Sequence, residues 1–159
     1  MAPAYDAAAV FASDAELRDA AETLLYSKGF RTGYCRDICP VTIVRASVAE
    51  RLIVARAEAG AGSATGPLDE GWMATMADYV TSVGMSLFSG SVAHVTTALS
   101  LRMLAPVPPD TRAVLVECTM DFAHQPPHAT AVFRDAERPD AMFAAAAHTK
   151  FIRPVKSLL

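Results

Sequence analysis

Apolar and polar positions alternate with a period of two along the second half of the chain. Such alternation is typical of a strand whose two faces meet different surroundings. Strands are therefore predicted over about 93–104, 114–122, 128–134 and 142–153, separated by turns rich in proline and acidic residues. In the first of them, one face is expected to carry Val95, Thr97, Leu99, Leu101 and Met103. Because turns of this length join antiparallel neighbours, the pattern predicts an antiparallel sheet.

Two other segments follow the period of an α-helix. Ser13 and Glu16 form a capping-box pattern, and apolar residues then recur at helical spacing, which predicts a helix over about 14–28. Residues 71–93 contain a single charge, Asp78, and predict a second helix buried in the core. Its apolar stripe consists of Met73, Met76, Ala77, Val80, Val83, Gly84 and Leu87. The serine, threonine and glycine content of this segment argues against a membrane span.

The first half of the sheet is expected to come from residues 41–59. They are rich in Val, Ile and Ala with charges interspersed, and they predict one long, half-exposed strand. Residues 60–67 are small and flexible and predict a loop. The buried helix then follows. Packing against the concave face of a curled sheet would bury its apolar surface. The predicted fold class is α+β: a curved antiparallel sheet wrapped around a central apolar helix, the hotdog fold, with an extra N-terminal helix.

Composition and charge narrow the possible functions. With 159 residues, 52% of them hydrophobic, the chain is expected to form one domain. Lys and Arg together number 14 against 17 Asp and Glu, so no broad cationic surface is expected and nucleic acid is excluded as a partner. Three cysteines, an odd number, and an N-terminus without a leader predict free thiols and a cytoplasmic location, with no support for a mitochondrial one.

No metal site is predicted. Cys35 and Cys39 have the spacing of half a zinc site, but no second Cys/His pair at ligand spacing is identified, and Cys118 lies inside a predicted strand. The histidines, at positions 94, 124, 128 and 148, have no Ser or Cys partner in a local motif, so no catalytic triad is predicted. Lys150 is expected to be a solvated surface charge, with contact to a phosphate group as the alternative.

Residues 66–78, GPLDEGWMATMAD, resemble the motif that begins the central helix of hotdog acyl-CoA thioesterases. The phenylacetate-pathway subfamily is the most similar; there the motif reads Gly, one or two residues, Leu-His-Gly-Gly and an apolar stretch to an Asp. The resemblance continues from His94 to Pro106 and closes at His148-Thr-Lys150, covering roughly 45–152. It implies an N-terminal helix and connecting segment at 1–45, a thioesterase-like domain at 46–153 and a short tail at 154–159. Two roles remain open for residues 1–45: covering an acyl tunnel, or covering an edge of the dimer.

The resemblance implies hydrolysis of an acyl-CoA with Asp78 as general base or nucleophile. The free amides of Glu70 and Gly71 at the helix start would polarise the thioester carbonyl. Ser63 stands fifteen residues before Asp78, where the subfamily has an Asn that helps to hold substrate and water. Thr96 corresponds to a strand hydroxyl near the attacking water. The residues assigned to substrate binding are Asp69, Thr96, Met103, Ala105 and Pro106.

Two departures from the subfamily pattern bear on activity. The His-Gly-Gly triplet is Asp69-Glu70-Gly71 in this chain, and the Asn is Ser63. An amide donor survives a change of side chain, but the two carboxylates add negative charge where an oxyanion would have to develop. A catalytically weak or binding-only acyl-CoA protein is therefore an alternative to the enzyme.

No cofactor is expected, since coenzyme A enters as part of the substrate. The family implies a homodimer or a dimer of dimers, and the strand at 93–104 would otherwise present an uncovered edge. Two further alternatives remain open. A hotdog hydratase or dehydratase would need an Asp/His pair acting on the acyl chain, and no such spacing precedes the buried helix. An unrelated α+β interaction domain would lack the wrapped helix.

Overall fold

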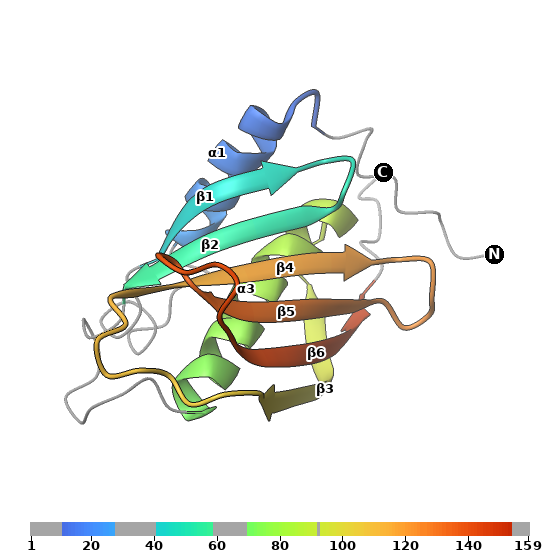
Figure 1. The fold of residues 1–159 in the computed structure, drawn as a ribbon. Helices are drawn as coiled ribbons and strands as arrows, with labels where there is room; N and C mark the ends of the chain where they lie inside the picture. Colours follow the sequence, from blue (N-terminus) through green and yellow to red (C-terminus); the bar gives the residue numbers. More distant parts are fainter. Residues whose placement is uncertain (1–10, 28–40, 59–69, 92, 154–159) are drawn as a thin grey trace, which may run out of the picture.

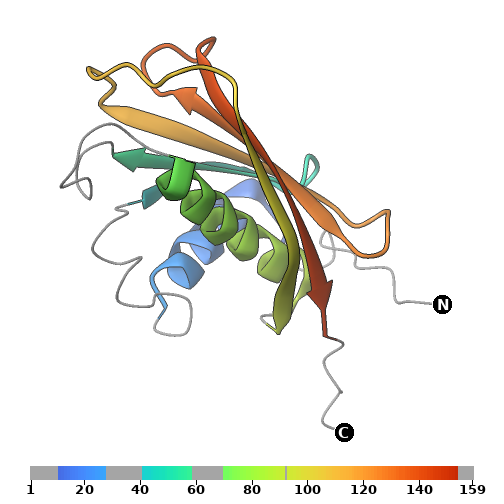
Figure 2. The ribbon, with the colours of Figure 1, turned by 90° about the horizontal axis from the view of Figure 1, so that it is seen from below.

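A curved sheet wraps around one long helix in the parts of the chain that the structure describes, residues 11–27, 41–58, 70–91 and 93–153 (Figure 1). In this computed structural model the helices are α1 (Asp14–Leu25) and α3 (Glu70–Ser89). The strands are β1 (Val41–Ser47), β2 (Leu52–Glu58), β3 (His94–Met103), β4 (Ala113–Asp121), β5 (His128–Asp135) and β6 (Met142–Ile152). They form one antiparallel sheet in the order β1-β2-β4-β5-β6-β3, and α3 lies in its concave face (Figure 2). The predicted α+β arrangement, with an extra N-terminal helix, is confirmed.

The prediction of one long strand over 41–59 is wrong, because the chain reverses at 48–51 and forms the β1–β2 hairpin. The Ser47 hydroxyl accepts the Glu50 N–H at 3.3 Å, and the Arg51 N–H donates to the Val48 carbonyl at 3.3 Å. Arg51 adopts a left-handed conformation with φ of 49°, which is uncommon for a residue with a side chain. The turn contains neither glycine nor proline, so its sequence carries no turn signal.

Helix α1 covers the outer edge of β1. Its capping box is present, since the Ser13 hydroxyl accepts the Glu16 N–H at 3.2 Å. The helix ends at Leu25, three residues earlier than predicted. Its buried face packs on β1 and α3, and the Glu22 carboxylate accepts the Ile43 N–H of β1 at 3.3 Å (Figure 2). The described part of 1–45 therefore protects one edge of the sheet and leaves the β3 edge open.

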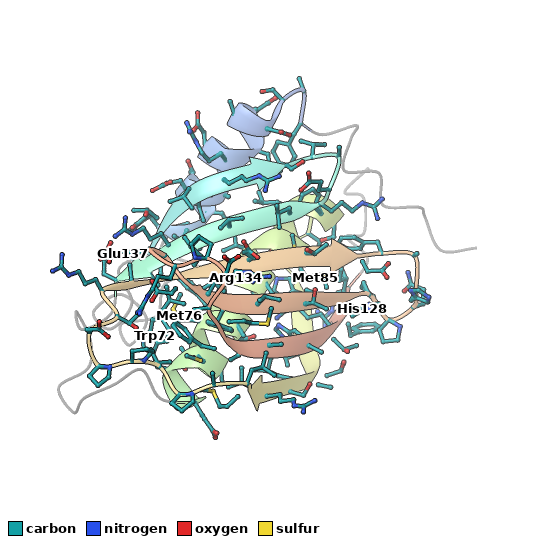
Figure 3. The ribbon with its side chains drawn as sticks, in the orientation of Figure 1. Trp72, Met76, Met85, His128, Arg134 and Glu137 are labelled. Atoms are coloured by element: carbon teal, nitrogen blue, oxygen red, sulfur yellow. The ribbon has the colours of Figure 1, made fainter. Side chains whose placement is uncertain are left out.

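Helix α3 is buried on most of its faces, as its apolar stripe predicts. Twelve of its residues are buried, and Figure 3 shows Met76 and Met85 among the side chains that pack behind the sheet. Gly84 permits a close approach to β4, since a Cβ atom there would lie 2.5 Å from the Met120 Cε atom. Gly90 follows the helix with φ of 66°, the left-handed conformation usual at such an end. None of the described helices is long and apolar enough to cross a membrane.

Strand β3 contains a bulge that changes which of its side chains share a face. Its pairing with β6 shifts register between Thr96 and Ala98, and such a bulge interrupts the alternation of faces. As a result Val95 points outward with 65% exposure, whereas Leu99 packs against the core. The prediction that Val95, Thr97 and Leu99 share one face is wrong. The bulge instead places Thr96 on the side that faces α3.

The remaining strands and the described cysteine agree with prediction. β4, β5 and β6 begin and end within one residue of the predicted ranges. Cys118 of β4 is a free, buried thiol, and burial raises its pKa, so it is protonated and unreactive near neutral pH. Cys35 and Cys39 lie outside the described residues.

Candidate active site

Polar side chains from α3, β3 and β6 meet at one place beside the helix. Asp78 belongs to α3, Thr96 to β3, and His148 and Lys150 to β6. The Asp78 Oδ1 atom lies 3.3 Å from Thr96 Oγ1, 3.4 Å from His148 Nε2 and 3.5 Å from Lys150 Nζ. Alternate residues of a strand face the same side, so two basic side chains two positions apart both reach the carboxylate. We refer to these four residues as the α3 cluster.

Asp78 and Thr96 are the accessible members of the α3 cluster. The Asp78 side chain is 51% exposed, while those of His148 and Lys150 are 1% and 3% exposed. Among the described residues, the side-chain contacts of Asp78, including one from the Ser82 hydroxyl at 3.5 Å, all go to Oδ1. The prediction of an isolated carboxylate inside an apolar interior is wrong. At Asp78, α3 is exposed beside the edge strand β3, and the side chains of His148 and Lys150 lie behind the carboxylate.

Hydrogen bonds fix the proton of His148 on one ring nitrogen. The Thr81 hydroxyl donates to the Ala77 carbonyl at 2.6 Å, so it accepts from His148 Nδ1, also at 2.6 Å. Nε2 is then the acceptor, and it lies 2.9 Å from the Thr96 hydroxyl. Burial, followed by the charge of Lys150, lowers the pKa of His148 to about 4. The ring is therefore neutral near pH 7.

Lys150 is buried, and its ammonium group has polar partners. Its Nζ donates to Thr96 Oγ1 at 3.2 Å and lies 3.5 Å from Asp78 Oδ1. Burial lowers the pKa of Lys150, and the Asp78 carboxylate opposes that shift. The expectation of a solvated surface charge is wrong, because position 150 falls on the helix-facing side of β6. A chain of hydrogen bonds thus runs from Lys150 through the Thr96 hydroxyl to Nε2 of His148.

A second histidine extends this polar region along α3. His94, the first residue of β3, has its Nε2 atom 2.8 Å from the Ser86 hydroxyl. Ser86 donates to the Ser82 carbonyl at 2.9 Å, so it accepts from the ring. Burial and then the charge of Lys150 lower the pKa of His94. The helix that is apolar toward β4 therefore carries a polar strip toward β3 and β6.

The structure brings together two of the residues predicted from the sequence, Asp78 and Thr96. It does not bring Glu70 and Gly71 to them. These two residues begin α3, eight and seven positions before Asp78, which is about 12 Å along the axis at a rise of about 1.5 Å per residue. Within one chain, the amides at the helix start and the Asp78 carboxylate cannot act on the same carbonyl group.

The remaining predicted residues lie elsewhere. Met103, Ala105 and Pro106 stand at and beyond the far end of β3, at the same end of the molecule as the start of α3 (Figure 2). They are partly or fully exposed, and among the described residues none of them is hydrogen-bonded to the α3 cluster. Ser63 and Asp69 lie outside the described residues, so their predicted roles are untested.

Sequence reasoning assigned no site role to His148 or Lys150. The hydroxyl partners of His148 lie 52 and 67 positions away in the chain, so no local motif links them. One weak sequence signal indicated that both side chains are buried: His148 and Lys150 occupy the same face of the strand as the apolar Ile152, at alternate positions. The run of alanines at 144–147 hides which face of this strand is buried, and the signal could not be used.

Comparison with known proteins supports the fold. No protein-family model matches the sequence, and no curated protein does. The structure of zebrafish thioesterase superfamily member 2 matches with a TM-score of 0.66 at 15% identity, covering 89% of this chain and 99% of that chain. The E. coli PaaI protein, from the phenylacetic acid degradation operon, matches with a TM-score of 0.63 at 10% identity, covering 87% and 96%. Thioesterase superfamily member 2 from Mus musculus gives a TM-score of 0.64 at 15% identity, covering 86% and 95%. At these identities the likeness establishes the architecture: the chain has the hotdog fold found in thioesterase superfamily structures.

Proposed function

We propose that the protein hydrolyses an acyl-CoA thioester, with Asp78 as the base that activates water. The observation that carries this proposal is the half-exposed Asp78 carboxylate, whose Oδ1 faces Lys150, Thr96 and Ser82 while Oδ2 makes none of those contacts. A positioned carboxylate with one unoccupied oxygen is suited to take a proton from water. The shared fold supports the same class of reaction by analogy.

In the proposed reaction, the Asp78 carboxylate removes a proton from water while the water oxygen attacks the thioester carbonyl. The new carbon–oxygen bond forms, the carbon–sulfur bond breaks, and the proton passes to the leaving sulfur, which departs as the free thiol of coenzyme A. Lys150 balances the charge of the carboxylate, and the Thr96 hydroxyl, which accepts from Lys150, lies 3.3 Å from it. Direct attack by Asp78 is the alternative, and heavy oxygen from solvent would then appear in Asp78 after one turnover.

The carbonyl must be polarised by groups outside the α3 cluster. Because Glu70 and Gly71 of the same chain are about 12 Å away along the helix, we assign this role to the corresponding amides of a second copy. Free N–H groups and the helix dipole favour a developing oxyanion at such a helix start. The site is then shared between two subunits, with Ser63, Asp69 and the 103–106 segment as proposed substrate contacts.

The β3 edge supports such a homodimer. β3 is the terminal strand of the sheet, pairs with β6 alone among the described strands, and is largely exposed. Asp78 and Thr96 lie beside this open edge, so a second copy placed there would enclose them. Light scattering coupled to size-exclusion chromatography is expected to give a dimer or a dimer of dimers. A monomer that turns over substrate would contradict the shared site.

A panel of acyl-CoA thioesters tests the proposed reaction, with release of free thiol as the readout. Short, long and aryl-acyl groups should all be included, since the acyl group is the part of the substrate that the α3 cluster does not define. Turnover by the parent protein and its loss in Asp78→Asn are the expected results. Tight binding of acyl-CoA without thiol release would instead identify a binding protein.

Hydration of an enoyl-CoA is the second candidate, and one observation favours it. The Asp/His pair that such a reaction requires is absent from the local sequence, but the fold supplies it as Asp78 and His148, 3.4 Å apart. Asp78, the accessible member of the pair, would be the base in that reaction, with the neutral, buried His148 behind it. The same protein is therefore assayed with an enoyl-CoA, and loss of the enoyl absorbance without thiol release would select this reaction over hydrolysis.

A further inference from the structure

Three side chains with metal-binding atoms meet at the turn between β4 and β5. Asp121 Oδ2 lies 3.1 Å from His124 Nδ1 and 3.4 Å from His128 Nε2. One ligand atom from each residue lies within 4.8 Å of the other two. Figure 3 shows His128 at the start of β5, beside this turn. We refer to these three residues as the turn cluster.

The hairpin itself holds the three side chains together. Asp121 ends β4, His128 begins β5, and the two residues are directly opposite in the antiparallel pairing, so their side chains share one face. His124 comes from the turn between them. The Ala123 N–H donates to Asp121 Oδ1 at 2.7 Å. This bond orients the carboxylate, and Oδ2 is the oxygen that meets both imidazole rings.

We propose that the turn cluster binds a divalent first-row transition-metal ion of the zinc class. Ligand atoms about 2.0–2.1 Å from a tetrahedral zinc ion lie roughly 3.3 Å from one another, and the two Asp121 contacts already have that spacing, at 3.1 and 3.4 Å. The sequence spacing His124-x3-His128 is also typical of zinc ligands. Two imidazoles and a carboxylate suit zinc, cobalt or nickel, whereas magnesium and calcium prefer oxygen ligands.

Both imidazole rings of the turn cluster approach the same oxygen, Asp121 Oδ2. A bound metal ion explains this arrangement better than hydrogen bonds alone. Each imidazole can donate to Asp121 Oδ2 only through a protonated nitrogen, whereas a metal ion uses the lone pairs of both rings and the carboxylate charge together. Packing does not force this arrangement, because the side chains of Asp121, His124 and His128 are 37%, 71% and 37% exposed. The exposure of His124 leaves room for water as a further ligand.

The turn cluster is separate from the α3 cluster. His128 lies opposite Thr149 of β6, whereas the flanking His148 and Lys150 face the helix. Successive residues of a strand point to opposite faces, so the turn cluster lies on the outer face of the sheet. His124-x3-His128 is a histidine pair at zinc-ligand spacing, with Asp121 three positions before it, so the prediction that no such pair accompanies Cys35 and Cys39 is wrong.

Zinc titration of the chelator-treated full chain tests the proposal by isothermal titration calorimetry. The parent is expected to bind one equivalent at the turn cluster. His124→Ala and His128→Ala should each weaken zinc binding by about tenfold to a hundredfold or more, at least the effect of losing a supporting residue around a metal. Asp140→Asn, which removes an exposed carboxylate from the β5–β6 turn, is the matched control and should bind as the parent does.

Nuclear magnetic resonance of the unsubstituted protein gives a readout that does not depend on any variant folding. Zinc is expected to shift the ring signals of His124 and His128 and to leave those of His94 and His148 in place. Cobalt should give the visible absorption of a site with imidazole ligands, and this band should disappear in both alanine variants. Equal zinc uptake by the parent and the His124→Ala/His128→Ala double variant would overturn the proposal, as would zinc-insensitive signals for both rings.

Discussion

Two groupings of aspartate and histidine lie on opposite faces of one sheet, and their surroundings give them different chemistry. In the α3 cluster His148 is 1% exposed, and burial followed by the charge of Lys150 lowers its pKa to about 4. In the turn cluster His128 is 37% exposed, and the Ala123 N–H is the main cause that lowers the pKa of the Asp121 carboxyl. Burial and a neighbouring lysine thus make His148 a neutral acceptor, whereas His128 is accessible to an ion from solvent.

The two clusters also differ in which partner meets the solvent. In the α3 cluster the carboxylate of Asp78 is half exposed, and the basic groups lie buried behind it. In the turn cluster the ring of His124 is the most exposed member, at 71%. A molecule that approaches the first cluster therefore meets a base, whereas an ion that approaches the second meets imidazole nitrogens.

The largest expected effect follows from Asp78→Asn. Asparagine keeps the shape of the side chain and an oxygen that can accept from Lys150 or Ser82, but it cannot take a proton from water. Thioester hydrolysis is expected to lose roughly 10²- to 10⁴-fold in kcat, the usual contribution of a general base, and the melting temperature is expected to fall because the buried Lys150 loses its counter-charge. Asp140→Asn is the control and should keep full activity. If Asp78→Asn hydrolyses at the parental rate, Asp78 is not the base.

The next effect is on stability, because His148 links folding to pH. Its pKa of about 4 in the folded protein lies below the ordinary 6.5, so the unfolded chain binds more protons between these values. The free energy of unfolding is expected to fall as pH is lowered from about 6.5 to about 4, with this residue contributing on the order of 3 kcal/mol. Above about pH 6.5 this contribution is fully present. Urea unfolding at a series of pH values measures it.

Two substitutions separate this buried ring from an exposed one. His148→Gln should remove most of the slope between pH 6.5 and 4, whereas His124→Gln should retain it. A smaller slope of the same sign should persist in His148→Gln, since the pKa of His94 is lowered too. If the free energy of unfolding of His148→Gln depends on pH as strongly as that of the parent, His148 takes up a proton in the folded state. Burial would then not distinguish His148 from the histidines of the turn cluster.

A smaller effect is expected from Thr96→Val, which removes the hydroxyl between Lys150, His148 and Asp78. Losing a hydrogen bond to charged partners is expected to lower the rate of thioester hydrolysis roughly tenfold. The loss should fall on kcat, because Thr96 orients the groups that react. Thr97→Val is the matched control, since the Thr97 hydroxyl bonds only to the Thr149 carbonyl among the described residues. Equal rates for the two variants would remove Thr96 from the site.

Local pattern predicted the two helices and the antiparallel strands after residue 93, and the family resemblance placed Thr96 near Asp78. Local pattern failed where a distant contact sets the outcome. The 48–51 reversal has no turn residue, and its left-handed Arg51 is held by neighbouring hydrogen bonds. The β3 bulge changes the face of a side chain without changing its residue type. The burial of Lys150 depends on which face of an alanine-rich strand meets α3, and periodicity in alanine does not reveal that.

The smallest expected effect comes from Asp121→Asn in the presence of a chelator. The ion pairs of Asp121 with the two histidines are exposed, and such pairs contribute little because solvent screens them. Asparagine also keeps an oxygen for the Ala123 N–H, so the melting temperature should hardly change. Added zinc should raise the melting temperature of the parent and leave that of Asp121→Asn in place, since only a ligand bound to the folded state stabilises it. Differential scanning calorimetry with and without zinc measures both effects. A large loss of stability in the presence of chelator would mean that the turn cluster stabilises the fold without a metal ion. The difference in burial would then not explain the different chemistry of the two clusters.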